Sequence, residues 1–135
     1  MTPIRSIAFV VNAQKAGAAE IAKDLMELAT SAGAEVKESH QFPVPADFLA
    51  GCDACCVIGG DGTLLGVARI AAEAGVPIIG VNRGSLGFLT TFSAEEAREY
   101  FATLIGGEFQ IAERALLSCS TAPGQQDVAL NDVLI

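Results

Sequence analysis

The chain has 135 residues, of which 51% are hydrophobic and 18% charged, and its formal net charge is −8. This composition is typical of a globular protein and excludes a disordered or low-complexity chain. The negative charge repels the phosphates of nucleic acid, so DNA and RNA are not expected partners. Apolar runs fall far short of the ~20 residues that cross a bilayer, and the N-terminus lacks a signal-peptide pattern. We therefore expect a cytoplasmic protein without a membrane span.

Four short apolar runs predict β-strands. They lack polar alternation, which is typical of strands that are buried on both faces of a parallel sheet. The runs are residues 7–11, 34–36, 54–58 and 77–81. With helical patterns between them, they predict an α/β fold, a Rossmann-like parallel sheet flanked by helices. Residues 41–51 contain two prolines and predict an irregular connection.

Three stretches predict helices. Residues 18–29 place apolar side chains at helical spacing, with charged side chains on the opposite face. Residues 64–74 are apolar or small almost all round, so we expect this second helix to be buried. The third helix opens with a capping box of Ser93 and Glu96. Its apolar positions at helical spacing are Ala97, Tyr100, Phe101, Leu104 and Ile105.

Beyond the third helix the pattern changes to that of a β region. Residues 109–120 and 128–135 predict two strands, joined by a turn over residues 121–127. We therefore divide the chain into an α/β phosphate-binding domain, residues 1–106, and the opening strands of a β-rich second domain, residues 107–135. The last three residues are apolar and fall within the second strand, which indicates a truncated domain.

Cys52, Cys55 and Cys56 form a C-x-x-C-C cluster, a pattern found in metal and redox sites. There is no second C-x-x-C, however, and the only histidine is His40. Cys55 and Cys56 also lie within an apolar run, where cysteine behaves as a small hydrophobic residue. We therefore predict a core position for these cysteines and no metal site formed by the protein.

The most informative motif is Gly59-Gly60-Asp61-Gly62-Thr63, which follows the third predicted strand directly and opens a helix. Open α/β sheets bind ligands at such turns. Glycines let backbone N–H groups approach phosphate oxygens, and the helix N-terminus adds a favourable dipole. Gly59, Gly60, Gly62 and Thr63 therefore predict a phosphate site, although neither a P-loop nor a dinucleotide fingerprint is present.

Asp61 is unusual beside a phosphate, because its carboxylate repels the ligand unless it accepts a proton or holds a metal. Its presence therefore favours a catalytic role. The competing interpretation is that Asp61 only caps a helix that starts at Thr63. Weaker candidates for contact with phosphate are Asn12, Lys15, Arg69 and Arg83.

The glycine loop resembles the G-G-D-G-T motif of NAD kinases, diacylglycerol-type lipid kinases and, more distantly, phosphofructokinases. Residues 80–90 are similar to the G-x-N-x-G-x-L-G-F-L segment of NAD kinases, and Asn131-Asp132 resembles their N-[ED] motif. Lipid kinases usually place Asn-Glu shortly after the threonine, where this chain has Leu64-Leu65-Gly66. The combination identifies the chain as similar to the N-terminal part of an NAD kinase.

This resemblance implies transfer of a phosphoryl group from ATP, or from polyphosphate in some members, to the adenosine ribose 2′-hydroxyl of NAD, which gives NADP. It also implies a divalent metal, expected to be Mg²⁺, and a homo-oligomer. Asp61 matches the family's proton acceptor. The residues expected to contact NAD are Asp61, Gly62, Phe88, Asn131 and Asp132, although Phe88 suits a core position equally well.

Nothing in the chain resembles the family's G-S-T-A-Y-like loop, so we expect little kinase activity from this polypeptide alone. The alternatives are a lipid- or sugar-type kinase that shares G-G-D-G-T, and a non-catalytic nucleotide-binding module, because a fold and one loop do not prove catalysis.

Overall fold

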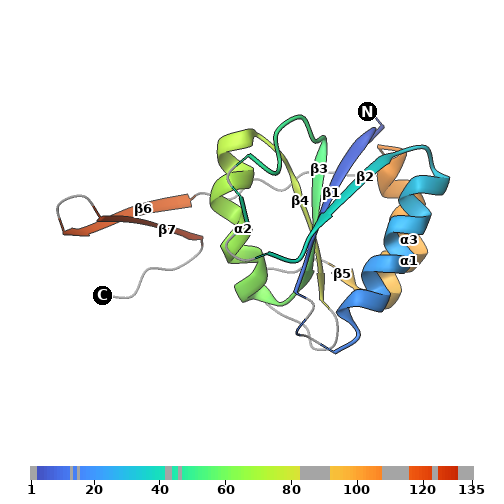
Figure 1. Ribbon diagram of the computed structural model, residues 1–135, viewed down its shortest axis with the longest axis horizontal. Helices are drawn as coiled ribbons and strands as arrows, with labels where there is room; N and C mark the ends of the chain where they lie inside the picture. The colour runs from blue at the N-terminus through green and yellow to red at the C-terminus, as the bar shows by residue number, and fades with distance from the viewer. Residues whose placement is uncertain are drawn as a thin grey trace.

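A computed structural model shows a parallel sheet flanked by helices, with a separate two-stranded hairpin (Figure 1). It describes residues 3–12, 14, 16–41, 44–45, 47–82, 92–107, 116–122 and 125–130. Residues 61, 82, 116–122 and 125–130 are described by their backbone alone, without their side chains. No helix in these ranges is long and apolar enough to span a membrane.

The sheet of the described chain has five strands, all parallel, in the order β2-β1-β3-β4-β5. The strands are β1 (Ser6–Val11), β2 (Glu35–Ser39), β3 (Ala54–Gly59), β4 (Ile78–Asn82) and β5 (Phe92–Ser93). The helices are α1 (Ala18–Ser31), α2 (Asp61–Ala74) and α3 (Ala94–Ile105). Helices α1 and α3 lie together on one face of the sheet, and α2 lies on the other (Figure 1).

The sheet separates two hydrophobic cores, because neighbouring side chains of a strand point to opposite faces. Phe9 and Cys56 belong to the core beneath α1 and α3, where the rings of Phe9 and Phe101 lie with centroids 5.9 Å apart. Val10 and Val57 belong to the core beneath α2. All of β3 and nearly all of β1 are buried, which confirms the predicted coverage on both faces for these two strands, whereas β2 is largely exposed and was wrongly expected to be covered in this way.

Two predictions of burial on the helices are wrong. Helix α2 buries Leu64, Val67 and Ala71 against the sheet, but Leu65 is 43% exposed, because a sheet covers only one side of the helix packed on it. Tyr100 of α3 is 48% exposed rather than buried. Tyrosine tolerates this position because its hydroxyl end favours water.

The strand boundaries also differ from those expected. Strand β2 runs to Ser39 with largely exposed polar residues, as an edge strand can, and the two-residue β5 carried no recognisable pattern. The capping box of α3 is confirmed, with Ser93 and Glu96 bonded reciprocally.

The C-terminal strands are β6 (Leu116–Ala122) and β7 (Gln125–Leu130), which pair as an antiparallel hairpin. Ala122 pairs with Gln125, so the predicted seven-residue turn is wrong: the strands reach further toward each other. Polar residues such as Gln125 resemble a loop in sequence but are tolerated in an antiparallel strand. The division of the chain into two domains stays a prediction.

Candidate functional site

The glycine loop lies at a topological switch point of the sheet. Strands β1 and β3 are neighbours at its centre, but β1 continues to β2 on one side, whereas β3 continues to β4 on the other. In open parallel sheets, ligands bind outside the carboxyl ends of the strands at such a point. Asn12 follows β1 there, and Gly60 follows β3.

The pairing of the strands brings the ends of four of them to the same level. Gly59 of β3 pairs with Asn82 of β4, which in turn pairs with Ser93 of β5. Val11 pairs with Ile58, and the next residue of the first turn, Asn12, donates its backbone N–H to the Ile58 carbonyl at 3.1 Å. Polar residues and glycine therefore line this carboxyl edge.

Helix α2 presents its N-terminus to the same edge. Gly60 is the N-cap, no side chain of the described residues caps this end, and the first helical bond runs from the Leu64 N–H to the Gly60 carbonyl at 3.1 Å. The N–H groups of residues 61–63 precede that bond and have no helical partner. Three backbone donors are thus available to an anion.

The competing interpretation of Asp61 as the cap of a helix starting at Thr63 is wrong. The helix begins two residues earlier, at Asp61 itself, with Gly60 in the capping position. Only the backbone of Asp61 is described. It is the first residue of α2, next to the carboxyl end of β3. Its catalytic role stays a prediction.

The glycines of the loop have different reasons to be glycine. A Cβ at Gly59 would lie 2.5 Å from the Thr63 Oγ1 and 2.9 Å from the Thr63 Cβ, so the fold itself requires glycine there. A Cβ at Gly60 or Gly62 would meet no described atom within 4 Å, and neither residue has a positive φ. Packing and backbone conformation therefore leave Gly60 and Gly62 unexplained, whereas a ligand lying against the loop would explain both.

Thr63 joins the loop to the turn that follows the first strand. Its side chain is 8% exposed, and its hydroxyl accepts a hydrogen bond from the side-chain amide of Asn12 at 3.4 Å. The amide oxygen of Asn12 in turn accepts from the Gln14 N–H at 3.3 Å. Because the Thr63 hydroxyl is buried against Asn12 and Gly59, its backbone N–H is the group best placed for the predicted phosphate contact.

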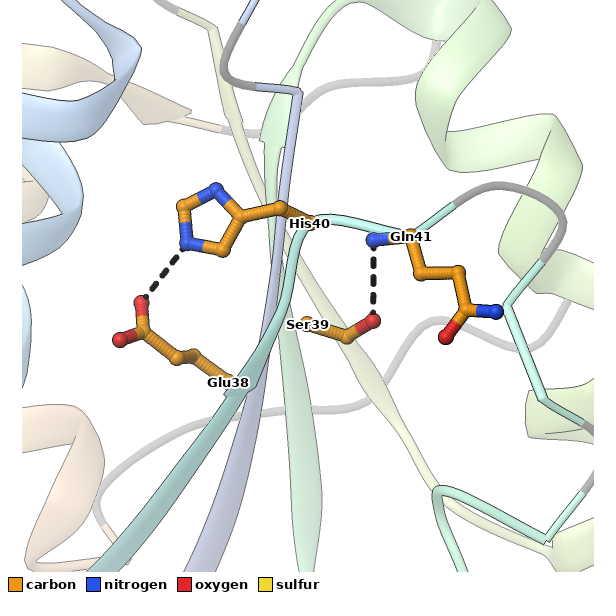
Figure 2. Close-up of polar contacts among 4 residues, drawn as sticks. All are labelled: Glu38, Ser39, His40 and Gln41. Carbon is orange, nitrogen blue, oxygen red and sulfur yellow. Dashed lines mark hydrogen bonds and ion pairs between the residues drawn. The ribbon is translucent and has the colours of Figure 1, made fainter.

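The carboxyl end of β2 carries a polar cluster that the sequence analysis did not single out (Figure 2). The His40 Nε2 lies 3.1 Å from the Glu38 Oε2, and the Gln41 N–H donates to the Ser39 Oγ at 3.2 Å. Figure 2 shows the His40 and Glu38 side chains on one side of the strand and the Ser39 and Gln41 side chains on the other. The only available signal was a run of polar residues after an apolar strand position.

The buried cysteines pack into the two cores. Cys55 faces α2, whereas Cys56 faces α1 and α3, so these neighbours point away from each other. Burial, with a smaller contribution from Cys52, raises the pKa of Cys55 from 9.0 to about 12, and burial likewise raises the pKa of Cys56. Thiols in this state are poor ligands and nucleophiles. Within the described ranges, no three His, Cys, Asp or Glu residues group as a metal site.

Arg69 is a predicted residue that the structure does not bring to the loop. The Arg69 Nε contacts the Glu73 Oε1 at 3.2 Å on the exposed surface of α2, which satisfies it without a phosphate. Five candidates lie outside the described residues: Lys15, Arg83, Phe88, Asn131 and Asp132.

Comparisons with known sequences agree on one family. Residues 43–109 match the ATP-NAD kinase N-terminal domain. Over 109 residues the chain is 41% identical to an NAD kinase of Pseudomonas putida, and the aligned region covers 76% of this chain and 36% of the relative. Over 102 residues it is 44% identical to an NAD kinase of Bordetella avium, and the aligned region covers 71% of this chain and 34% of the relative. The chain thus spans about a third of the length of these curated relatives.

A solved structure shows the same fold. The chain resembles the crystal structure of yeast NADH kinase complexed with NADH, with a TM-score of 0.64 and 18% sequence identity. The similarity covers 96% of this chain and 47% of the yeast chain. At this low identity the match shows the α/β fold alone.

Proposed function

Because the chain belongs to the NAD kinase family, we propose that it supplies the phosphate-handling part of an enzyme that phosphorylates NAD. The proposed reaction transfers the γ-phosphoryl group of ATP to the 2′-hydroxyl of the adenosine ribose of NAD, which yields NADP, ADP and a proton. The observation that carries the proposal is the glycine loop at the switch point, where Gly60 and Gly62 leave open space beside the N-terminus of α2.

The loop would act mainly by positioning. Phosphoryl transfer needs the attacking and leaving oxygens in line, and its charge lies on the oxygens of the transferred group. The N–H groups of residues 61–63 would hold phosphate oxygens without the reorganisation that water requires. Thr63, held by Asn12 and packed on Gly59, fixes the backbone that carries these donors.

Asp61 is the proposed proton acceptor. As the first residue of α2, it stands where the backbone donors would bind the phosphate, so it can be reached by a hydroxyl attacking that phosphate. Its carboxylate would orient the 2′-hydroxyl and take its proton late in the transfer. Asn131, Asp132 and Phe88 remain proposed contacts for NAD.

The divalent cation that the family implies fits this site only if it binds together with ATP. Mg²⁺ usually keeps several waters and binds substrate phosphates together with one or two carboxylates, rather than a protein cage. Asp61 is the carboxylate of the loop that would serve, and when bound the cation would offset phosphate charge. A homo-oligomer and a cytoplasmic location stay predictions from the family resemblance.

The experiment joins this chain to the remaining two thirds of the Pseudomonas putida relative and measures NADP formed from NAD, ATP and Mg²⁺. The joined protein should form NADP, and Asp61→Asn should abolish turnover while NAD binding is largely kept. Asp47→Asn, which changes an exposed carboxylate away from the loop, is the matched control and should remain active. Full turnover by Asp61→Asn would refute the proton-acceptor role. Consumption of ATP with a lipid or sugar, but not with NAD, would favour the alternative kinases.

A further inference from the structure

The carboxyl end of β2 lies on the same edge of the sheet as the glycine loop. Strand β2 pairs in parallel with β1, with Ser39 opposite Val10, and β1 pairs in parallel with β3. The end of β2 is therefore two strand spacings, roughly 10 Å, from the loop that follows β3. An extended nucleoside triphosphate whose terminal phosphate lies at the loop has its ribose and base at a comparable distance.

The side chains at this end of β2 suit a nucleoside. The imidazole of His40 is held by Glu38 at 3.1 Å, and both side chains are 46% exposed, so a ligand can reach them. An aromatic ring offers a base a stacking surface. Glu38 uses one carboxylate oxygen for His40, and a carboxylate has further capacity to accept hydrogen bonds from ribose hydroxyls.

We propose that the carboxyl end of β2 is the subsite for the adenosine half of the phosphate donor, with His40 stacked on the base and Glu38 accepting from the ribose. The inference rests on the proposed function, because it takes the phosphates to lie at the glycine loop.

A competing explanation is that charges on β2 only protect an edge strand from pairing with other chains. Glu35 and Lys37 already provide such charges at exposed positions of the same strand. Lys37 lies on the opposite face from Glu38, with its Nζ 4.9 Å from the centroid of the Phe48 ring. Protection of the edge therefore does not require the ordered contact between Glu38 and His40.

His40 is the only histidine of the chain, so its imidazole proton resonances can be assigned without ambiguity. The first experiment titrates the chain with ADP and, separately, with inorganic tripolyphosphate at one fixed pH, and follows His40 and the backbone amides of Gly60 and Gly62. Both ligands should shift the two glycine amides, but only ADP should shift His40 strongly. Equal shifts of His40 with both ligands, or none with ADP, would overturn the adenosine subsite.

Variants provide the second measurement. His40→Ala should weaken ADP binding about tenfold, because stacking of one base contributes about 1–3 kcal/mol, and should leave tripolyphosphate binding unchanged. Glu38→Gln should weaken ADP in the same selective way, whereas Glu35→Gln, at the far end of β2, is the control and should have no effect. Unaltered ADP affinity in both variants would overturn the inference while the phosphate site stands. If neither ligand shifted Gly60 or Gly62, the phosphate site of the proposed function would fail, and this inference with it.

Discussion

The side-chain amide of Asn12 donates to the hydroxyl of Thr63 at 3.4 Å, across 51 positions of sequence. The bond links the turn after β1 to the first turn of α2, at the switch point of the sheet. Gly59 packs directly against the same threonine. The conformation of the glycine loop therefore depends on a residue of a distant turn, the one that follows β1.

We predict that Asn12 and Thr63 stabilise the fold jointly. Asn12→Ala and Thr63→Val should each lower the free energy of unfolding by about 1 kcal/mol, because each removes one partner of a part-buried hydrogen bond. The double variant should lose less than the sum, with a coupling of about 0.5–1 kcal/mol in urea unfolding. Gln14→Ala is the control, because Gln14 contributes only its backbone N–H to this turn. Additive losses would show that the two residues act independently.

Substitution of the loop glycines by alanine should change stability at one position and ligand binding at the other two. Gly59→Ala should destabilise the chain by about 1–3 kcal/mol, because its Cβ collides with Thr63. Gly60→Ala and Gly62→Ala have room for a Cβ, so neither should destabilise the chain, yet both should bind tripolyphosphate more weakly by calorimetry.

Gly66→Ala is the matched control for this series. Gly66 lies within the same helix and also has open space, but it is outside the loop. Alanine there should raise stability by about 0.5–1 kcal/mol, through the loss of glycine's backbone freedom, and should leave binding unchanged. Unimpaired tripolyphosphate binding by Gly60→Ala and Gly62→Ala would contradict the phosphate site.

Local pattern was sufficient to predict much of the fold. Continuous apolar runs predicted β1 and β3 because burial on both faces leaves no polar alternation, and Ser93 with Glu96 predicted the start of α3 because the capping box is a local device. The strand-loop-helix position of the glycine motif was likewise predictable, since it depends on consecutive residues.

Relationships between distant residues could not be predicted in this way. The bond from Asn12 to Thr63 depends on β1 and β3 being neighbours, which the order of the sheet decides rather than either local sequence. The position of His40 beside the same edge depends on the pairing of β2 with β1. Exposure of Tyr100 likewise depends on how much of α3 its neighbours cover, whereas spacing alone places it on the apolar face.

Asp53 should stabilise the start of the sheet without affecting ligand binding. Its Oδ2 accepts from the backbone N–H groups of Arg5 at 2.9 Å and Ser6 at 3.1 Å, and thereby joins the entry of β3 to that of β1. Asp53→Ala should lower the free energy of unfolding by about 1 kcal/mol, because water can partly replace these exposed bonds. ADP affinity should not change, since Asp53 lies at the amino ends of the strands and the proposed ligand site lies at their carboxyl ends. A loss of affinity in a fully folded variant would contradict this separation.

Cys55 should make the fold sensitive to alkaline pH. Burial raises the pKa of its thiol from 9.0 to about 12, so the native state favours the neutral thiol more than the unfolded state does. This contribution to stability is complete below pH 9.0 and is lost as the pH rises toward 12. Within that window the free energy of unfolding should fall by about 1.4 kcal/mol per pH unit for each such thiol, and Cys56 acts in the same direction.

Urea unfolding at several pH values between 8 and about 10.5 would measure this slope. Cys55→Ala should be less stable at every pH, because it leaves a cavity, but should show a shallower slope, since one buried thiol no longer titrates. Identical slopes for the variant and the natural chain would show that ionisation of Cys55 is not linked to unfolding.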